Sequence, residues 1–291
     1  MNISDGKRVL DEYPGDANRQ ADVIGLDEYM AYDSSNTRSE GQTAPMIEIW
    51  SRLQAQDMLV PGSVLGQEVF DQYRRIKRPL ISNAFGKTSS LVDGGNLILV
   101  TSSVPGEGKT YTSVNLAIAM AQEKDSTVLL VDGDVNKQGV SRMLGIENRP
   151  GLIDVLSKDT MSMADVLLKT DIPGLSVIPA GQTHAYVTEL LASNRMEALI
   201  EELSRRYADR LILIDAPPLL PTPQTQVVAR LAGQIVFVIE AGKTSRFLID
   251  EALAMIPEEK PVGLVLNKRE GSWGGGGYYK NYYGLYTDGK T

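Results

Sequence analysis

Residues 97–123 read LILVTSSVPGEGKTYTSVNLAIAMAQE, and this stretch decides the fold. It opens with a short apolar run, Leu97–Thr101, which is typical of a buried strand. A loop rich in turn residues follows at Ser103–Thr110, and a helical pattern extends over Tyr111–Glu123. A strand, a glycine loop and a helix in this order predict a loop that binds the phosphates of a nucleotide.

The residues of this loop suit phosphate chemistry. Gly106 and Gly108 let backbone N–H groups turn inward around a phosphate, and the start of the following helix adds the positive end of its dipole. Lys109 can reach the β and γ phosphates, and the Thr110 hydroxyl can ligate Mg²⁺. Ser103 stands where the general pattern has glycine. The residues expected to contact the nucleotide are Pro105, Gly106, Glu107, Gly108, Lys109, Thr110 and Tyr111.

Further apolar runs alternate with helical patterns after the loop. They are continuously apolar, as in strands that are buried on both faces, and helices between them imply a parallel sheet. We therefore predict an α/β fold, a doubly wound and mostly parallel sheet with helices on both faces. The runs are Thr127–Asp132, Leu175–Ile178, Leu211–Asp215, Gln234–Ile239 and Val262–Leu266.

Carboxylates stand at the ends of two of these runs. Asp132 and Asp134 follow the second strand, and Asp215 ends the run Leu211–Asp215. A single aspartate in such a place is often only a helix cap. A buried carboxylate needs a cation or a metal, however, and ligands bind beyond the carboxyl ends of parallel strands. Together with the phosphate loop, the three aspartates predict a Mg²⁺ site and a proton acceptor.

Composition excludes several classes of protein. The 291 residues are 42% apolar and 23% charged, which is ordinary for a soluble globular chain of one large domain with appendages. Without cysteine, and with His184 as the one histidine, thiol chemistry and His-based metal cages are excluded. The net charge of -8 disfavours binding to nucleic acid or to an anionic bilayer. No run approaches the roughly 18 apolar residues of a membrane span, so we expect a cytoplasmic protein.

The chain divides into three parts by composition. Residues 1–62 are polar and form a flexible region with one amphipathic helix, residues 63–270 form the main domain, and residues 271–291 form a tail of glycine and tyrosine. The expected helix carries apolar residues at the spacing of one helical face. It docks either on its own domain or on a partner chain. Its apolar residues are Met46, Ile49, Trp50 and Leu53.

A basic cluster lies in the helical pattern that begins at Gln67. Pro79 is expected to end this helix, and cations in a last turn complement the helix dipole. The dipole does not by itself explain a cluster of this size. The cations are Arg74, Arg75, Lys77 and Arg78.

Three motifs together resemble those of a known family. The segments SVPGEGKT (103–110), VDGDVNK (131–137) and LILIDAPP (211–218) resemble the Walker A, A′ and B motifs of bacterial tyrosine kinases, which belong to the deviant-Walker P-loop ATPases. The tyrosines of the tail fit the same family. RRIKRP (74–79) and PAGQTHAYVTELLAS (179–193) are similar to the exosortase-associated autokinases of exopolysaccharide export.

The resemblance implies roles for the residues of the motifs. Lys109 and Thr110 become phosphate and metal ligands, Asp215 becomes the Walker B carboxylate, and Asp134 joins Thr110 and Asp215 at Mg²⁺. Either Asp132 or Asp134 is implied to assist removal of the tyrosine proton. The implied cofactors are ATP and Mg²⁺.

The resemblance also extends to the C-terminal residues. Asn267 matches the position that contacts adenine, although an asparagine at a strand end is commonly only a turn residue. The implied phosphorylation sites lie in the tail. They are Tyr278, Tyr279, Tyr282, Tyr283 and Tyr286.

Two departures from the family pattern bear on activity and assembly. Asn136 stands where the A′ motif often has arginine, with Lys137 next to it. The family's E-x-x-R-x-x-R helix motif, which contacts a neighbouring subunit, becomes Glu68-x-x-Asp71-x-x-Arg74.

The implied activity is an ATP-dependent protein-tyrosine autokinase that modifies its own tail and those of neighbouring subunits, and so regulates exopolysaccharide synthesis or export. The short linker between the last strand and Tyr278 favours reaction in trans, on the tail of a neighbouring subunit. The implied partners are further copies of the chain, with a ring as one form, and a membrane-embedded polysaccharide co-polymerase that acts as activator and recruits the protein to the membrane. The alternatives are a non-kinase ATPase switch and a nucleotide-binding assembly scaffold.

Overall fold

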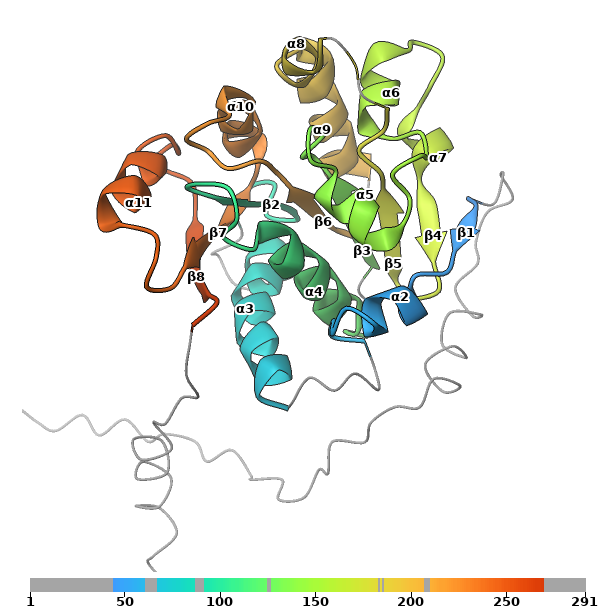
Figure 1. The fold of residues 1–291 in the computed structure, drawn as a ribbon. Helices are drawn as coiled ribbons and strands as arrows, with labels where there is room; N and C mark the ends of the chain where they lie inside the picture. The colour runs from blue at the N-terminus through green and yellow to red at the C-terminus, as the bar shows by residue number, and fades with distance from the viewer. Residues whose placement is uncertain are drawn as a thin grey trace, which may run out of the picture.

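A mostly parallel sheet forms the centre of the molecule. The computed structural model describes residues 44–60, 67–86, 92–124, 127–182, 184, 186–206 and 210–269. Within these residues, eight strands form one sheet in the order β1-β4-β5-β3-β6-β2-β7-β8 (Figure 1). Only β4 and β5 pair in antiparallel fashion among the strands described. The strands are β1 (Met46–Ile47), β2 (Leu97–Ser102), β3 (Thr127–Asp132), β4 (Leu168–Thr170), β5 (Leu175–Ile178), β6 (Arg210–Asp215), β7 (Gln234–Glu240) and β8 (Val262–Asn267).

Helices connect the strands and cover the sheet. Figure 1 shows α3 and α4 against one face, with α9 and α10 on the other. The helices are α2 (Trp50–Gln54), α3 (Gln67–Phe85), α4 (Lys109–Ala121), α5 (Gly139–Leu144), α6 (Leu152–Ser157), α7 (Met163–Val166), α8 (Val187–Leu191), α9 (Asn194–Arg206), α10 (Pro223–Leu231) and α11 (Arg246–Leu253). Of the helices in the described part of the chain, none combines the length and the apolar character that a membrane crossing requires.

The central strands are buried on both faces, as the apolar runs predict. Neighbouring residues of β2 enter different cores: Val100 packs in the cluster under α3 and α4, and Leu99 packs in the cluster under α9 and α10. In β6, Leu213 packs in the first of these clusters and Ile212 packs in the second. The predicted doubly wound α/β fold is therefore confirmed.

The N-terminal segment differs from the predicted helix. Residues Met46–Ile47 form β1, which pairs with β4, and the helix begins only at Trp50. The Asp171 carboxylate sets this start, because it accepts hydrogen bonds from the backbone N–H groups of Ile49 at 2.9 Å and of Trp50 at 3.1 Å. Ile49 and Leu53 are fully buried in the core cluster of the domain. Of the two docking alternatives, packing on its own domain is confirmed.

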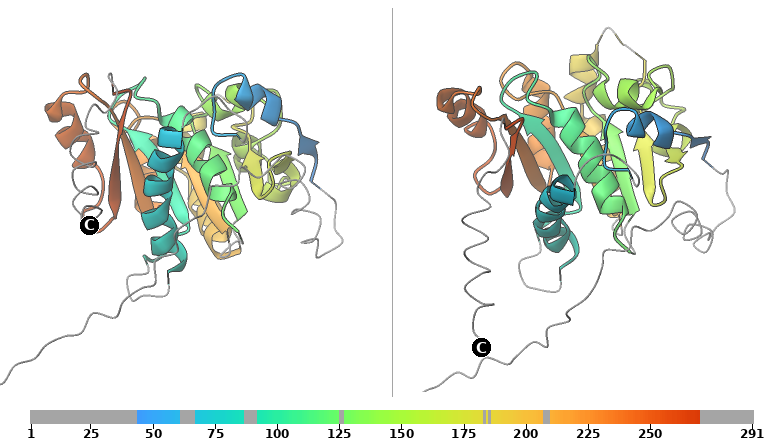
Figure 2. Two further views of the ribbon diagram at one scale, coloured as in Figure 1. Left: turned by 90° about the horizontal axis from the view of Figure 1, so that it is seen from below. Right: turned by 60° about the horizontal axis from the view of Figure 1, so that its bottom comes forward.

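Residues 44–60 thus pack with the domain that follows them, although the sequence assigned them to a separate region ending at residue 62. Figure 2 shows β1 at one edge of the sheet and β8 with α11 at the other. The boundary at residue 62 falls outside the described residues and stays a prediction, as does the tail over 271–291.

Helix α3 continues through Pro79 to Phe85, so the predicted end at Pro79 is wrong. A proline inside a helix removes the hydrogen bond to the carbonyl four residues earlier, here that of Arg75. Both Pro79 and Arg75 are exposed, so water can satisfy this carbonyl. The opposite side of α3 packs through Tyr73 and Leu80 into the core, which holds the helix together across the proline.

The basic residues of α3 do not share one surface, because one of them is buried. Lys77 is buried, and its Nζ donates to the carbonyl of Ala119 at 2.5 Å and pairs with Glu123 at 2.9 Å. Ala119 lies in the last turn of α4, where carbonyl groups lack helical partners. Lys77 therefore fastens α3 to the end of the helix that follows the phosphate loop, and does not belong to an exposed basic surface.

Replacing Lys77 by methionine should lower the free energy of unfolding by about 1 to 3 kcal/mol, because a buried carbonyl loses a charged donor. Arg78→Met is the matched control on the exposed side of the same helix and should change stability by less than about 0.5 kcal/mol. Urea unfolding of both variants measures the difference. Equal stability of the two variants would contradict the role given to Lys77.

Candidate active site

The phosphate loop has the backbone shape that its glycines predict. Gly106 and Gly108 adopt left-handed conformations, with φ values of 94° and 95°. A Cβ atom at Gly108 would lie 2.0 Å from Nδ2 of Asn267, whereas the space beside Gly106 is open. Helix α4 begins directly after the loop, at Lys109. The loop therefore brings its N–H groups and a helix N-terminus to one place, as phosphate binding requires.

Lys109 lies beside two carboxylates. Its side chain is largely buried, and burial lowers its pKa, while the charges of Asp215 and Asp134 act in the opposite direction. The position suits a group that meets phosphate oxygens at the mouth of the loop.

Asp215 is fixed at the end of β6 by the helix that follows the loop. Its Oδ2 accepts a hydrogen bond from the Thr110 hydroxyl at 2.8 Å, and its Oδ1 accepts one from the Ser113 hydroxyl at 2.9 Å. Burial raises the pKa of Asp215 to about 6, and these two hydrogen bonds with the charge of Lys109 oppose the rise. Thr110 and Asp215, both expected at Mg²⁺, are therefore in direct contact.

Asp132 lies next to Asp215 across the sheet. The two residues are paired in the register of β3 with β6. Oδ2 of Asp132 accepts hydrogen bonds from the backbone N–H of Ser141 at 2.8 Å and from its hydroxyl at 2.7 Å, while Oδ1 is buried with no hydrogen-bond partner. Burial and the nearby Asp215 charge raise the pKa of Asp132 to about 7. The carboxylate is thus poised to exchange a proton near neutral pH.

Asp134 begins the turn after β3. Its Oδ1 accepts a hydrogen bond from the backbone N–H of Lys137 at 3.1 Å, and its backbone carbonyl accepts one from Gln138 at 2.6 Å. Asn136 and Lys137, which depart from the family pattern, are exposed on this turn. Asp134 itself is largely buried beside Lys109.

These residues fit Mg²⁺ bound with a nucleotide. The hydroxyl of Thr110 and the carboxylates of Asp134 and Asp215 are oxygen donors, which Mg²⁺ prefers. Among the described residues, no cluster of three or more His, Cys, Asp and Glu side chains could hold a metal by itself. Mg²⁺ at nucleotide sites usually takes only one or two carboxylates and completes its coordination with phosphates and water. The donor set thus matches a metal that is brought in with its nucleotide.

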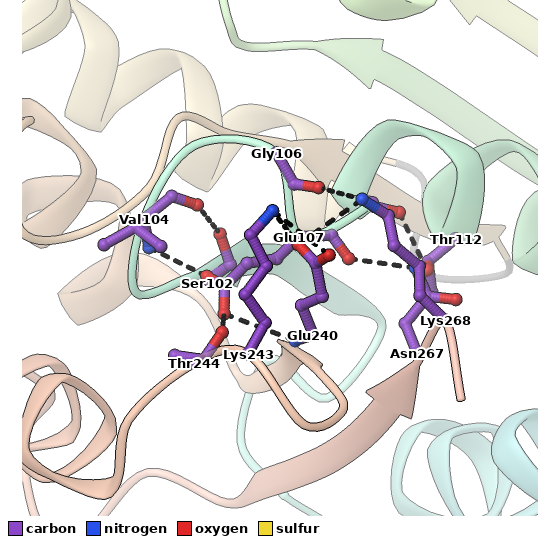
Figure 3. Close-up of polar contacts among 11 residues, drawn as sticks. Ser102, Val104, Gly106, Glu107, Thr112, Glu240, Lys243, Thr244, Asn267 and Lys268 are labelled. Carbon is purple, nitrogen blue, oxygen red and sulfur yellow. Dashed lines mark hydrogen bonds and ion pairs between the residues drawn. The ribbon is translucent and has the colours of Figure 1, made fainter. Parts of the chain in front are cut away.

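The end of β8 reaches the phosphate loop. Nδ2 of Asn267 donates to the carbonyl of Glu107 at 2.9 Å, and Nζ of Lys268 donates to the carbonyl of Gly106 at 2.5 Å (Figure 3). Asn267 is therefore a contact of the loop backbone. Its expected contact with adenine stays a prediction.

Two other residues expected to contact the nucleotide lie in the loop and at the start of α4. The Tyr111 hydroxyl donates to the carbonyl of Asp57 at 3.3 Å, in the N-terminal segment, and Pro105 is exposed on the loop. His184 accepts a hydrogen bond through Nδ1 from the backbone N–H of Tyr186 at 3.2 Å. The tail tyrosines lie outside the described residues.

Comparisons with known proteins identify the family of this chain. A sequence model described as an AAA domain matches residues 95–248. Tyrosine-protein kinase YwqD of Bacillus subtilis is 34% identical over 176 residues, which cover 60% of this chain and 72% of YwqD. The chain belongs to the bacterial tyrosine kinases.

This chain spans less than a third of the length of two other relatives. Tyrosine-protein kinase ptk of Acinetobacter johnsonii is 31% identical over 59% of the chain, which spans 23% of ptk. The succinoglycan biosynthesis transport protein ExoP of Rhizobium meliloti is 30% identical over 80% of the chain, which spans 31% of ExoP.

A solved structure is also similar to this chain. The match with the BceF tyrosine kinase domain covers 84% of this chain and 89% of that domain, with 26% identity and a TM-score of 0.58.

The sequence did not single out two serines that complete the site of this bacterial tyrosine kinase. Ser113 stands three residues after Thr110 on α4, so helical spacing places both hydroxyls on one face, and this signal was available. Ser141 lies nine residues from Asp132 with no local pattern to connect them. Only the fold of the turn after β3 brings Ser141 to the carboxylate.

Asp132→Asn should stabilise the kinase when Mg²⁺ and nucleotide are absent. The pKa of Asp132, about 7, exceeds its ordinary value of 3.8, so the folded state holds a proton that the unfolded state has lost. Stability contributed by this group therefore falls as the pH rises from about 4 through 7, and remains low above that range.

We expect the melting temperature of Asp132→Asn to exceed that of the wild type by about 5 °C or more at pH 8. The difference should shrink as the pH is lowered toward 5, where the buried carboxyl is neutral. Thermal unfolding at both pH values measures it. A difference that does not change with pH would show that the charge of Asp132 is not its source.

Proposed function

We propose that this chain is an ATP-dependent protein-tyrosine autokinase that phosphorylates its tail in trans. The observation that carries the proposal is the grouping of charges beside a loop shaped for phosphate: Asp134 and Asp215 act on the charge of Lys109, and Asp132 is paired with Asp215 across the sheet. Phosphoryl transfer needs positioning and charge stabilisation more than covalent chemistry, and this group of charges supplies both.

The roles follow from the contacts. Backbone N–H groups of the loop and Lys109 would bind the nucleotide phosphates, and Thr110, Asp134 and Asp215 would hold Mg²⁺, which neutralises phosphate charge when bound. The tyrosine oxygen forms a bond to the γ phosphorus, the bond to the ADP oxygen breaks, and the tyrosine proton moves to Asp132 or Asp134. The raised pKa of Asp132 favours this residue as an acceptor near neutral pH.

The tail supplies the acceptor tyrosines. Its first tyrosine, Tyr278, is separated from Asn267 by a short segment that ends in four glycines. Asn267 itself contacts the phosphate loop. A tail attached so near its own site would need a tight reversal to enter it, whereas a neighbouring subunit's site can be reached by an extended path. This geometry supports reaction in trans.

Assembly and regulation complete the proposal. We expect a homo-oligomer, and a membrane-embedded polysaccharide co-polymerase as activator in exopolysaccharide synthesis or export; the name of the relative ExoP supports that setting. Arg74 of the assembly motif pairs with Asp71 of its own helix at 3.3 Å, and Asp71 stands where the family has arginine. We therefore expect this motif to contact a neighbouring subunit differently from the family's motif.

Lys109→Met should abolish phosphotyrosine, because groups aimed at developing charge contribute a factor of about 10² to 10³ or more in rate. The matched control is Lys169→Met, an exposed lysine on β4. Mass spectrometry of both variants after incubation with ATP and Mg²⁺ gives the readout. Unchanged phosphotyrosine in Lys109→Met would contradict the role of the phosphate loop in catalysis.

Reaction in trans is tested by mixing a catalytically inactive chain that keeps its tail with an active chain that lacks its tail. Full-length Lys109→Met should gain phosphate on its tail from wild type that lacks residues 278–291, at a rate that rises with the concentration of the truncated enzyme. If the truncated enzyme leaves the tail unmodified while wild type modifies itself at a rate independent of concentration, the reaction occurs in cis.

A further inference from the structure

A buried carboxylate lies inside the phosphate loop. Glu107 is completely buried, although an uncompensated charge in such a place is strongly unfavourable. Its Oε2 accepts a hydrogen bond from the backbone N–H of Val104 at 2.8 Å, and its Oε1 accepts one from the Thr244 hydroxyl at 2.6 Å and a longer one from the N–H of Glu240 at 3.4 Å (Figure 3). Donors from two separate segments therefore compensate this charge.

The hydrogen bond from Val104 to Glu107 joins two residues of the phosphate loop. Because the N–H of Val104 is occupied by Glu107, it is not available to a phosphate. A negative charge within a phosphate-binding loop would also repel the ligand if it faced the open side. Glu107 instead faces the turn between β7 and α11, which contains Thr244. The carboxylate thus has a shaping role and does not contact the nucleotide.

The opposite end of the loop is held through its backbone. The carbonyl groups of Gly106 and Glu107 accept hydrogen bonds from Lys268 and Asn267. In a trans peptide the N–H of the next residue points away from the carbonyl. The N–H groups of Glu107 and Gly108 therefore point away from these side chains, as the cradling of a phosphate requires.

We propose that Thr244 is a positioning residue for the nucleotide phosphates, acting through the Glu107 carboxylate on the shape of the loop. The proposal rests on the nucleotide site of the proposed function. Thr244 is remote in sequence from the loop, 137 residues from Glu107, and belongs to none of the three motifs. A hydrogen bond to a charged group is among the stronger ones, so its loss should be transmitted to the loop.

The test compares two ligands that share the base and sugar but differ in phosphate. Thr244→Val keeps the shape of the side chain and removes the hydroxyl, and Thr244→Ser keeps the hydroxyl. For Thr244→Val we expect the Kd of Mg·ADP to rise about tenfold, with the Kd of adenosine changed by less than about twofold. Thr244→Ser should bind both ligands as the wild type does. Displacement of a fluorescent ADP analogue from the full chain measures all of these constants.

Glu107→Gln provides a second variant, since it removes the charge and should show the same selective loss of ADP. An unchanged Kd for Mg·ADP in Thr244→Val, or equal weakening of ADP and adenosine, would overturn the positioning role, because a purely structural bond would not distinguish the two ligands. If the wild type bound no Mg·ADP, both the nucleotide site and the positioning role of Thr244 would be contradicted. Selective ADP loss without any phosphotyrosine in wild type would support the positioning role and overturn only the kinase proposal.

Discussion

The Asp215 carboxylate, buried at the end of β6, accepts hydrogen bonds from both Thr110 and Ser113 of α4. These two bonds connect the middle of the sheet to the helix that follows the phosphate loop. The register of β3 with β6 then places Asp132 beside Asp215, and α4 places Lys109 where the charges of Asp215 and Asp134 act on it. Parallel strands make this convergence unavoidable, because their carboxyl ends share one edge. The chemistry of the site depends on where β6 ends.

Such a concentration of buried charge opposes folding. Burial raises the pKa of Asp132 and of Asp215, which means that the folded protein favours their neutral forms. Hydrogen bonds to Asp215 offset part of this cost, whereas Oδ1 of Asp132 has no partner. A bound cation would relieve both carboxylates. Carboxylates with pKa values raised by burial are typical of functional sites.

The sequence predicted the features that have a continuous local signal. Apolar runs such as Leu97–Thr101 were recognised as central strands because a strand buried on both faces is almost continuously apolar. The strands β1 and β4 were missed because two or three residues carry no periodicity. The predicted helix end at Pro79 was wrong because Pro79 lies on the exposed side of α3, while the opposite side packs into the core. Which side of a helix is exposed depends on tertiary packing. The bond between Glu107 and Thr244 joins residues with no sequence relation, so only the fold reveals it.

The phosphate loop is held by the turn after β7, by the end of β8 with Lys268, and by α4, which begins directly after it. The central claim is that this site transfers phosphate to tyrosine. Mapping phosphate by mass spectrometry on the wild-type chain after incubation with ATP and Mg²⁺ tests it most directly. The account predicts phosphate on tyrosines between Tyr278 and Tyr286. Hydrolysis of ATP with every tyrosine unmodified would contradict it and identify an ATPase switch instead.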